Sequence, residues 1–219
     1  MKQLILPLFA AACVFTACET PEATSVADVQ GKAVSTDLND GTYVINKVKP
    51  KVTWGASKLT GDGHNGTLHV ESGKFMLTNG EITAGKVIFD MERIEVTDLT
   101  GEDKASLEGH LRSGDFFNVA THPKATLAVN GVNDINGTNM LDATLTLNGK
   151  AVDYAIPVEM VEAEVPGGMK GLAIQGRFGM DRTKHDITYH SQTFDDKLDW
   201  FINDEVKITF SVIGMPITR

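Results

Sequence analysis

Six histidines are the side chains of this 219-residue sequence best suited to proton transfer or metal binding near neutral pH. They are His64, His69, His110, His122, His185 and His190. No pair has the His-x-His or His-Glu-x-x-His spacing of a zinc site. His64 and His69 would point to opposite faces of one regular strand. We therefore expect structural or surface histidines and no metal site.

Nucleophilic catalysis has little support either. The sequence has no Gly-x-Ser-x-Gly motif, and its two cysteines, Cys13 and Cys18, both lie near the N-terminus. Asp90 and Glu92 would share a strand face and could mimic a pair of catalytic carboxylates, but a solvated face explains them better. No set of residues demands catalysis, and we predict a protein that is not an enzyme and needs no cofactor.

The N-terminus resembles a bacterial lipoprotein signal peptide. Lys2 carries a positive charge, residues 4–14 form an apolar run too short to span a bilayer, and Ala17-Cys18 follows. This pattern predicts a signal peptide over residues 1–17 and lipidation of Cys18. The lipid would tether the protein to a membrane of the exported cell envelope, facing the periplasm or the cell surface. An ordinary secretory signal cut nearby is the alternative.

Residues 18–40 are rich in Thr, Ser, Ala and acidic residues. This composition predicts a flexible linker, with a hidden short strand as the alternative. The formal net charge of the whole chain is −9. That charge argues against a nucleic acid partner, because phosphate binding requires a basic surface.

From residue 41 onward, apolar and polar residues alternate with a period of two, which is typical of strands with one buried face. Clear stripes run over 52–56, 141–147, 154–160 and 206–212. Turn signals separate the runs at Asn79-Gly80, Asn130-Gly131, Asn136-Gly137 and Asn148-Gly149. About eight strands predict an all-β fold, either a sandwich or a closed antiparallel barrel that can hold one small ligand. The length of several strands favours the barrel.

The stretch 101–127 interrupts this alternation with a short helix, expected over residues 102–113. Thr100 is placed to cap its start, and Gly114 to end it in a left-handed conformation. Leu107 and Leu111 share one face of the helix, and two adjacent phenylalanines follow at 116 and 117. Such a helix cannot bury itself, so we expect it to cover an apolar opening such as the mouth of a barrel.

The inward-facing stripes alone predict only a packed core. Two features favour a ligand cavity instead. One is the aromatic pair beside the helix. The other is a recurrence of small residues within the strand runs, where they leave room or allow tight bends. These residues are Gly55, Ala56, Ala84, Gly85, Ala143, Gly176 and Gly179.

The helix segment also carries a family resemblance. His110-Leu111-Arg112-Ser113, then residues 115–119 (Asp-Phe-Phe-Asn-Val) and Pro123, resemble the signature segment of the YceI-like polyisoprenoid-binding family. Residues 43–46, 52–54, 145–149, 156–158 and 181–183 are similar to further shared segments. The resemblance extends over about residues 42–214.

This resemblance implies a lipocalin-like, eight-stranded antiparallel β-barrel over residues 41–214. The barrel would hold a polyisoprenoid or similar long apolar lipid, with the helix near its mouth. The residues expected to line or close the cavity are Trp54, Phe89, Leu107, Leu111, Phe116, Phe117, Leu145, Ile156, Phe178 and Phe210. Arg112 is expected to contact a lipid head group.

Two alternatives stay open. One is an enzyme acting on a lipid or quinone precursor with His110 or His185 as its base. The other is a stress-response or adhesion module whose barrel is packed solid.

Overall fold

The computed structural model describes residues 38–46, 50–194 and 201–217. This part of the chain holds nine strands, one α-helix and one 3-10 helix. Their bounds are β1 Gly41–Ile45, β2 Lys51–Ser57, β3 Gly63–Thr78, β4 Glu81–Val96, α1 Gly101–Arg112, β5 Lys124–Ile135, β6 Thr138–Leu147, β7 Lys150–Val165, β8 Met169–Asp181, the 3-10 helix Arg182–His185 and β9 Glu205–Pro216.

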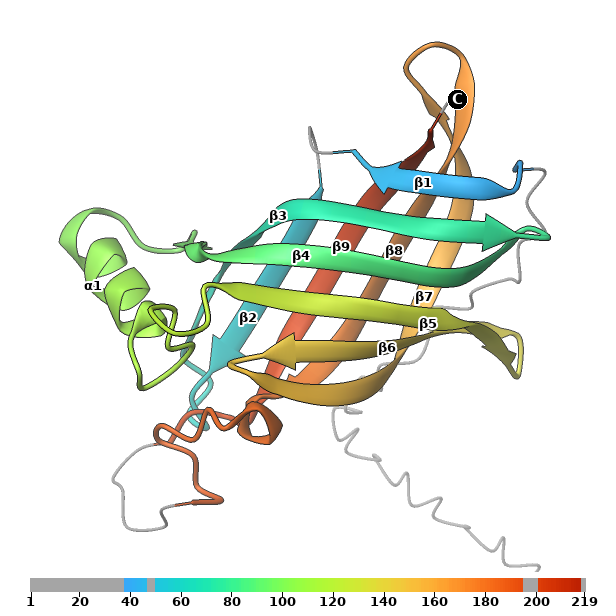
Figure 1. Ribbon diagram of the computed structural model, residues 1–219. Helices are drawn as coiled ribbons and strands as arrows, with labels where there is room; N and C mark the ends of the chain where they lie inside the picture. Colours follow the sequence, from blue (N-terminus) through green and yellow to red (C-terminus); the bar gives the residue numbers. More distant parts are fainter. Residues whose placement is uncertain (1–37, 47–49, 195–200, 218–219) are drawn as a thin grey trace, which may run out of the picture.

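The strands form one antiparallel sheet that closes on itself (Figure 1). Strands β3 to β9 pair in sequence order, and the short strands β1 and β2 both lie between β3 and β9. β1 and β2 are therefore two halves of one interrupted barrel strand, and the barrel has eight strand positions. The predicted eight-stranded antiparallel barrel is confirmed.

Three of the predicted Asn-Gly turns join neighbouring strands. At Asn79-Gly80, Asn136-Gly137 and Asn148-Gly149 both residues have positive φ, as a tight hairpin requires. The fourth expectation was wrong. Asn130-Gly131 lies inside β5, where the register with β6 shifts between Val129 and Gly131. This pair makes a strand irregularity, because a glycine within a strand can mark a bulge as well as a turn.

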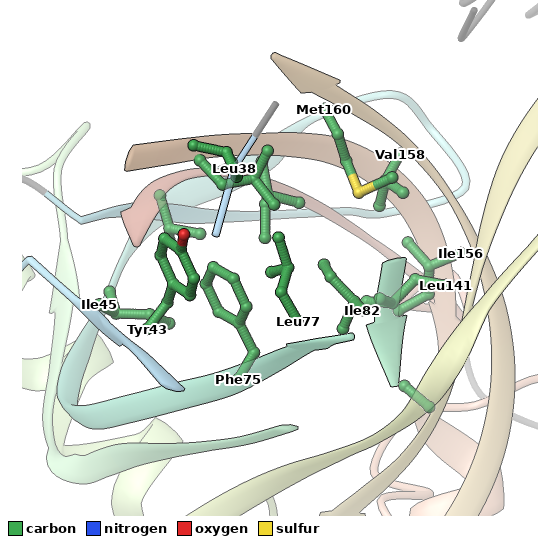
Figure 2. Packing of buried hydrophobic residues seen from close by; sticks show 14 residues of the cluster. Leu38, Tyr43, Ile45, Phe75, Leu77, Ile82, Leu141, Ile156, Val158 and Met160 are labelled. Carbon is green, nitrogen blue, oxygen red and sulfur yellow. The ribbon is translucent and has the colours of Figure 1, made fainter. Parts of the chain in front are cut away.

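One end of the barrel, called here the Leu38 end, is filled by side chains. Leu38 lies across it and is 7% exposed, packed with Tyr43, Leu77 and Met160 (Figure 2). The Tyr43 hydroxyl donates to the carbonyl of Asn39 at 2.9 Å and holds this segment in place. Leu38, which precedes the expected domain start at 41, thus belongs to the core.

The opposite end, called the helix end, carries α1 between β4 and β5 (Figure 1). α1 matches the expected helix to within one residue at each end, and Leu111 is its buried contact. Two local expectations fail. Thr100 makes no side-chain cap, and Ser113 instead of Gly114 ends the helix, with an extended backbone. Glu108 anchors α1 by accepting a hydrogen bond from the backbone N–H of Val96 at 3.0 Å.

Arg182 closes the helix end from the other side. Its side chain is only 2% exposed. Burial lowers the pKa of Arg182 by more than the nearby carboxylates of Asp204 and Asp181 raise it. A buried guanidinium must have its donors satisfied. It donates to backbone carbonyls of Ile187, Tyr189, Ile202 and Asn203 and to the carboxylate of Asp204. Arg182 thereby ties the described parts of the β8–β9 connection to the barrel.

His185 is fully buried beside Arg182. Its Nε2 accepts from the Tyr154 hydroxyl at 3.0 Å, and its Nδ1 donates to the Lys150 carbonyl at 3.1 Å. Burial lowers the pKa of His185 below its ordinary value of 6.5, more than backbone hydrogen bonds and nearby aspartates raise it. Burial also raises the pKa of Tyr154 to about 12. This pair is therefore neutral in the folded protein.

We predict that Gly66→Ala destabilises the barrel while Gly55→Ala does not. A Cβ at Gly66 would meet the Trp54 indole at 2.6 Å and the Glu95 carbonyl, whereas at Gly55 nothing lies within 4 Å. Forcing a methyl into a packed site costs about 1–3 kcal/mol. Urea unfolding of both variants measures the difference, and equal stability would contradict the close packing of Trp54 on Gly66.

We also predict that His185 makes the protein lose stability below about pH 6.5. There the unfolded chain binds a proton at this histidine that the folded protein, with its lowered pKa, does not bind. The free energy of unfolding then falls by up to about 1.4 kcal/mol per pH unit. Wild type and His185→Gln are to be unfolded in urea between pH 8 and pH 5. The variant should show a shallower decline, and parallel profiles would refute this assignment.

Candidate functional site

A cavity of about 160 Å³ occupies the barrel interior. It lies among the inward-facing side chains of both halves of the barrel, from Ile45 and Ile82 toward the Leu38 end to Ile187 and Ile202 at the helix end. The wall surface that faces the cavity is apolar throughout. Such a space offers no hydrogen bonds and therefore selects for hydrocarbon.

Two chain segments meet over the cavity at the helix end. Phe116 and Phe117, which follow α1, line the cavity from one side, and Ile187 of the β8–β9 connection lines it from the other. The segments touch through aromatic rings. The centroid of Tyr189 lies 5.0 Å from that of His110 and 5.3 Å from that of Phe116. The aromatic pair predicted to cover a barrel mouth does lie at one.

Most residues expected at the cavity line it, and two do not. Ile156 is fully buried in the core of the Leu38 end, and Leu107 packs against the core at the helix end without reaching the cavity. The residues that do line it are Trp54, Phe89, Leu111, Phe116, Phe117, Leu145, Phe178 and Phe210. Their contact with a lipid stays a prediction.

Arg112 does not line the cavity. Its guanidinium Nη2 donates to Glu108 at 3.2 Å and to the Ile94 carbonyl at 3.4 Å, on the outer side of the mouth. The Nε atom is buried without a hydrogen-bond partner. These contacts tie α1 to β4, and the expected head-group role stays a prediction.

Sequence reasoning missed much of the cavity wall. The additional lining residues include Leu68, Val87, Met91, Ile94, Leu127, Leu147, Ile174, Met180, Ile187 and Ile208. Many of them belong to the alternating stripes, so the signal for an inward direction was present. Alternation cannot tell a side chain that packs from one that borders empty space.

The histidines of the described residues are placed in structural or surface roles. Both ring nitrogens of His185 are engaged, and it does not line the cavity. His110 pairs with Asp115 at 3.0 Å on the outer face of the mouth. No described group of three or more His, Cys, Asp or Glu side chains is arranged to hold a metal ion.

The membrane-anchor predictions fall outside the described part of the chain. The expected signal peptide, Cys18 and most of the linker lie before residue 38. None of the described helices is long and apolar enough to cross a bilayer.

Solved structures with the same fold were found at low sequence identity. BcnA of Burkholderia cenocepacia superposes with a TM-score of 0.59 at 16% identity, covering 78% of this chain and 99% of BcnA. A polyisoprenoid binding domain from Saccharophagus degradans gives 0.56 at 15% identity, covering 80% and 98%. The Campylobacter jejuni YceI protein gives 0.51 at 14% identity, covering 92% and 99%. These similarities show a shared fold.

A search of curated proteins found no match. The family model described as the YceI-like domain matches residues 43–213, which includes both mouth segments and all or part of every strand of the barrel. With the barrel, the mouth helix and this match in agreement, the chain belongs to the YceI-like family.

Proposed function

We propose that this protein binds a long apolar lipid, a polyisoprenoid or a similar chain, inside its barrel and carries or sequesters it without catalysis. The observation that carries this proposal is the interior cavity with its wholly apolar wall. Each methylene moved from water into such a space contributes roughly 0.8 kcal/mol. A few isoprenoid units therefore offset the cost of ordering the ligand.

Two lines of support come from outside the cavity. The chain shares its family with YceI proteins and its fold with a domain described as polyisoprenoid binding. The N-terminal pattern that ends at Cys18 supports an exported, lipid-tethered protein of the bacterial cell envelope. In that setting a soluble domain would have access to lipids of the neighbouring membrane.

The cavity volume limits how the lipid enters. At about 160 Å³ it is close to that of an engineered protein cavity of about 150 Å³ that binds benzene. A long chain therefore needs more room than the described state has. Its wall includes Met91, Met180 and several phenylalanines, and methionine in particular adapts easily to a new neighbour. We propose that the wall repacks around the ligand.

The two alternatives are less well supported. A solid barrel would have no interior space, whereas this one has a cavity. For an enzyme, His185 would have to give up its hydrogen bonds with Tyr154 and Lys150 before acting as a base.

The proposal predicts that the protein, produced in bacterial cells from Glu19 onward and purified without detergent, carries or takes up lipid. Native mass spectrometry should show a bound mass in the lipid range. If the protein is isolated empty, a series from geraniol through farnesol to longer polyprenols should bind with affinity that rises with chain length. Failure of the whole series to bind would refute the lipid-carrier function.

Phe117→Asp should reduce lipid retention more than stability. This half-buried side chain lines the cavity mouth, where a carboxylate would face the apolar tail without a partner. Phe194→Asp is the matched control, because Phe194 is 61% exposed and does not line the cavity. Lipid extracted per mole of protein should fall about tenfold only in Phe117→Asp, with both variants folded by thermal unfolding. Equal lipid content in all three proteins would remove Phe117 from the binding site.

A further inference from the structure

The interior cavity does not reach the Leu38 end of the barrel. On β3, Phe75 is the last inward side chain that lines the cavity in this direction, and the next one, Leu77, does not line it. On β9, Val212 lines it, and the next inward position, Gly214, does not. The inner end of the cavity therefore lies at Phe75, where an aromatic ring meets a glycine of another strand.

The ring of Phe75 occupies its position because Gly214 has no side chain. A methyl group at Gly214 would overlap the ring atoms Cε1 and Cζ of Phe75, and Cβ of Tyr43 would lie 3.3 Å from it. The backbone of Gly214 does not have the positive φ that favours glycine. Glycine is therefore needed here for the space that it leaves, and not for its conformational freedom.

Two other aromatic side chains of the cavity wall also lie over glycines. A Cβ at Gly66 would meet the indole of Trp54, and a Cβ at Gly176 would meet Cζ of Phe210 at 2.7 Å. Each of these glycines pairs directly with its aromatic residue on the neighbouring strand. At both positions a Cβ would also collide with a backbone carbonyl, whereas at Gly214 the three nearest atoms all belong to side chains. Gly214 is therefore the position at which a substitution moves a ring without moving a strand.

Packing at the Leu38 end leaves the Phe75 ring no room in that direction. The ring of Tyr43 stacks on it, with the centroids 5.5 Å apart and the planes within 8° of parallel. Leu38, Leu77 and Met160 belong to the same packed cluster (Figure 2). A displaced Phe75 ring would therefore move into the cavity. Because a cavity of about 150 Å³ holds one benzene molecule, a phenyl ring would fill much of the 160 Å³ present here.

The remainder of the wall can adapt while the inner end stays fixed. Both methionines that line the cavity, Met91 and Met180, belong to the buried cluster at the helix end. Phe75 belongs to the cluster at the Leu38 end, together with Tyr43 and Leu77, which are each only 1% exposed. Methionine adapts easily to a new neighbour, so room for a ligand is gained toward the mouth. The depth of the cavity is limited by Phe75.

We propose that the Phe75 ring, held between Gly214 and Tyr43, is the stop at which the tail of a bound lipid ends, and that it sets the tail length which the barrel accepts. The lipid lies with its head group toward the helix end, because the apolar wall offers a polar group no hydrogen bond. The inference rests on the proposed lipid-carrier function and adds the residue that determines chain-length selectivity.

The chain length at which affinity stops rising tests this inference. Affinities of geraniol, farnesol, geranylgeraniol and longer polyprenols are measured by competition with a fluorescent lipid analogue. In wild type, affinity should rise with each isoprene unit and level off once the tail reaches Phe75. Gly214→Ala should move this limit to a shorter chain, because the ring is pushed into the cavity, and Phe75→Leu should move it to a longer one. The chain at the wild-type limit should bind about tenfold more weakly to Gly214→Ala, as expected when roughly two methylenes are left unburied.

The double variant Gly214→Ala with Phe75→Leu should recover the wild-type limit, since the new methyl group takes up space that the smaller side chain leaves. Gly55→Ala is the matched control, because nothing lies within 4 Å of a Cβ there and Gly55 does not line the cavity. Thermal unfolding verifies that each variant is folded, and Phe75→Leu alone decides the question if Gly214→Ala does not fold.

The outcomes separate this inference from the lipid-carrier function. Single variants that keep the wild-type limit, or that both shift it in the same direction as a loosened barrel would, overturn the inference while the carrier function stands. A wild-type affinity that rises through the whole series also overturns it, because the tail then meets no stop. Failure of every polyprenol to bind wild type overturns both.

Discussion

Closure of one antiparallel sheet is the constraint on which the rest of this structure depends. In the described part of the chain, β1 and β2 pair with β3 on one side and with β9 on the other, and this pairing closes the sheet. Closure forces every inward side chain toward one axis. With eight strand positions the interior is just wide enough for side chains to fill, or to hold one small ligand. Small changes in side-chain size then decide between a solid core and a cavity.

The two ends of this barrel are closed in different ways. At the Leu38 end, the side chains of Leu38, Tyr43 and Phe75 fill the space, and the rings of Tyr43 and Phe75 stack with their centroids 5.5 Å apart. At the helix end, buried polar groups hold the covering segments, since Arg182 collects backbone carbonyls that no strand partner satisfies. Between the packed end and the covered end lies the apolar cavity.

The fold was largely predictable from sequence, because alternation, Asn-Gly turns and one amphipathic helix each have a local physical cause. Those signals predicted about eight strands, α1 and the aromatic pair at the mouth, whereas strand length and the family resemblance favoured the barrel over a sandwich. They failed where two local rules give the same pattern. Asn130-Gly131 satisfies a turn rule and a bulge rule, and Ile156 and Leu145 have the same alternation although only Leu145 borders the cavity. Tertiary packing decides these cases, and it cannot be inferred from the local pattern of a single sequence.

The shared barrel position of β1 and β2 could not be predicted for a related reason. Residues 43–56 read as an ordinary strand pair in the sequence. Only the pairing of both short strands with β3 and β9 shows that they occupy one position in the barrel. Such pairing depends on residues far away in the sequence, which local patterns do not report.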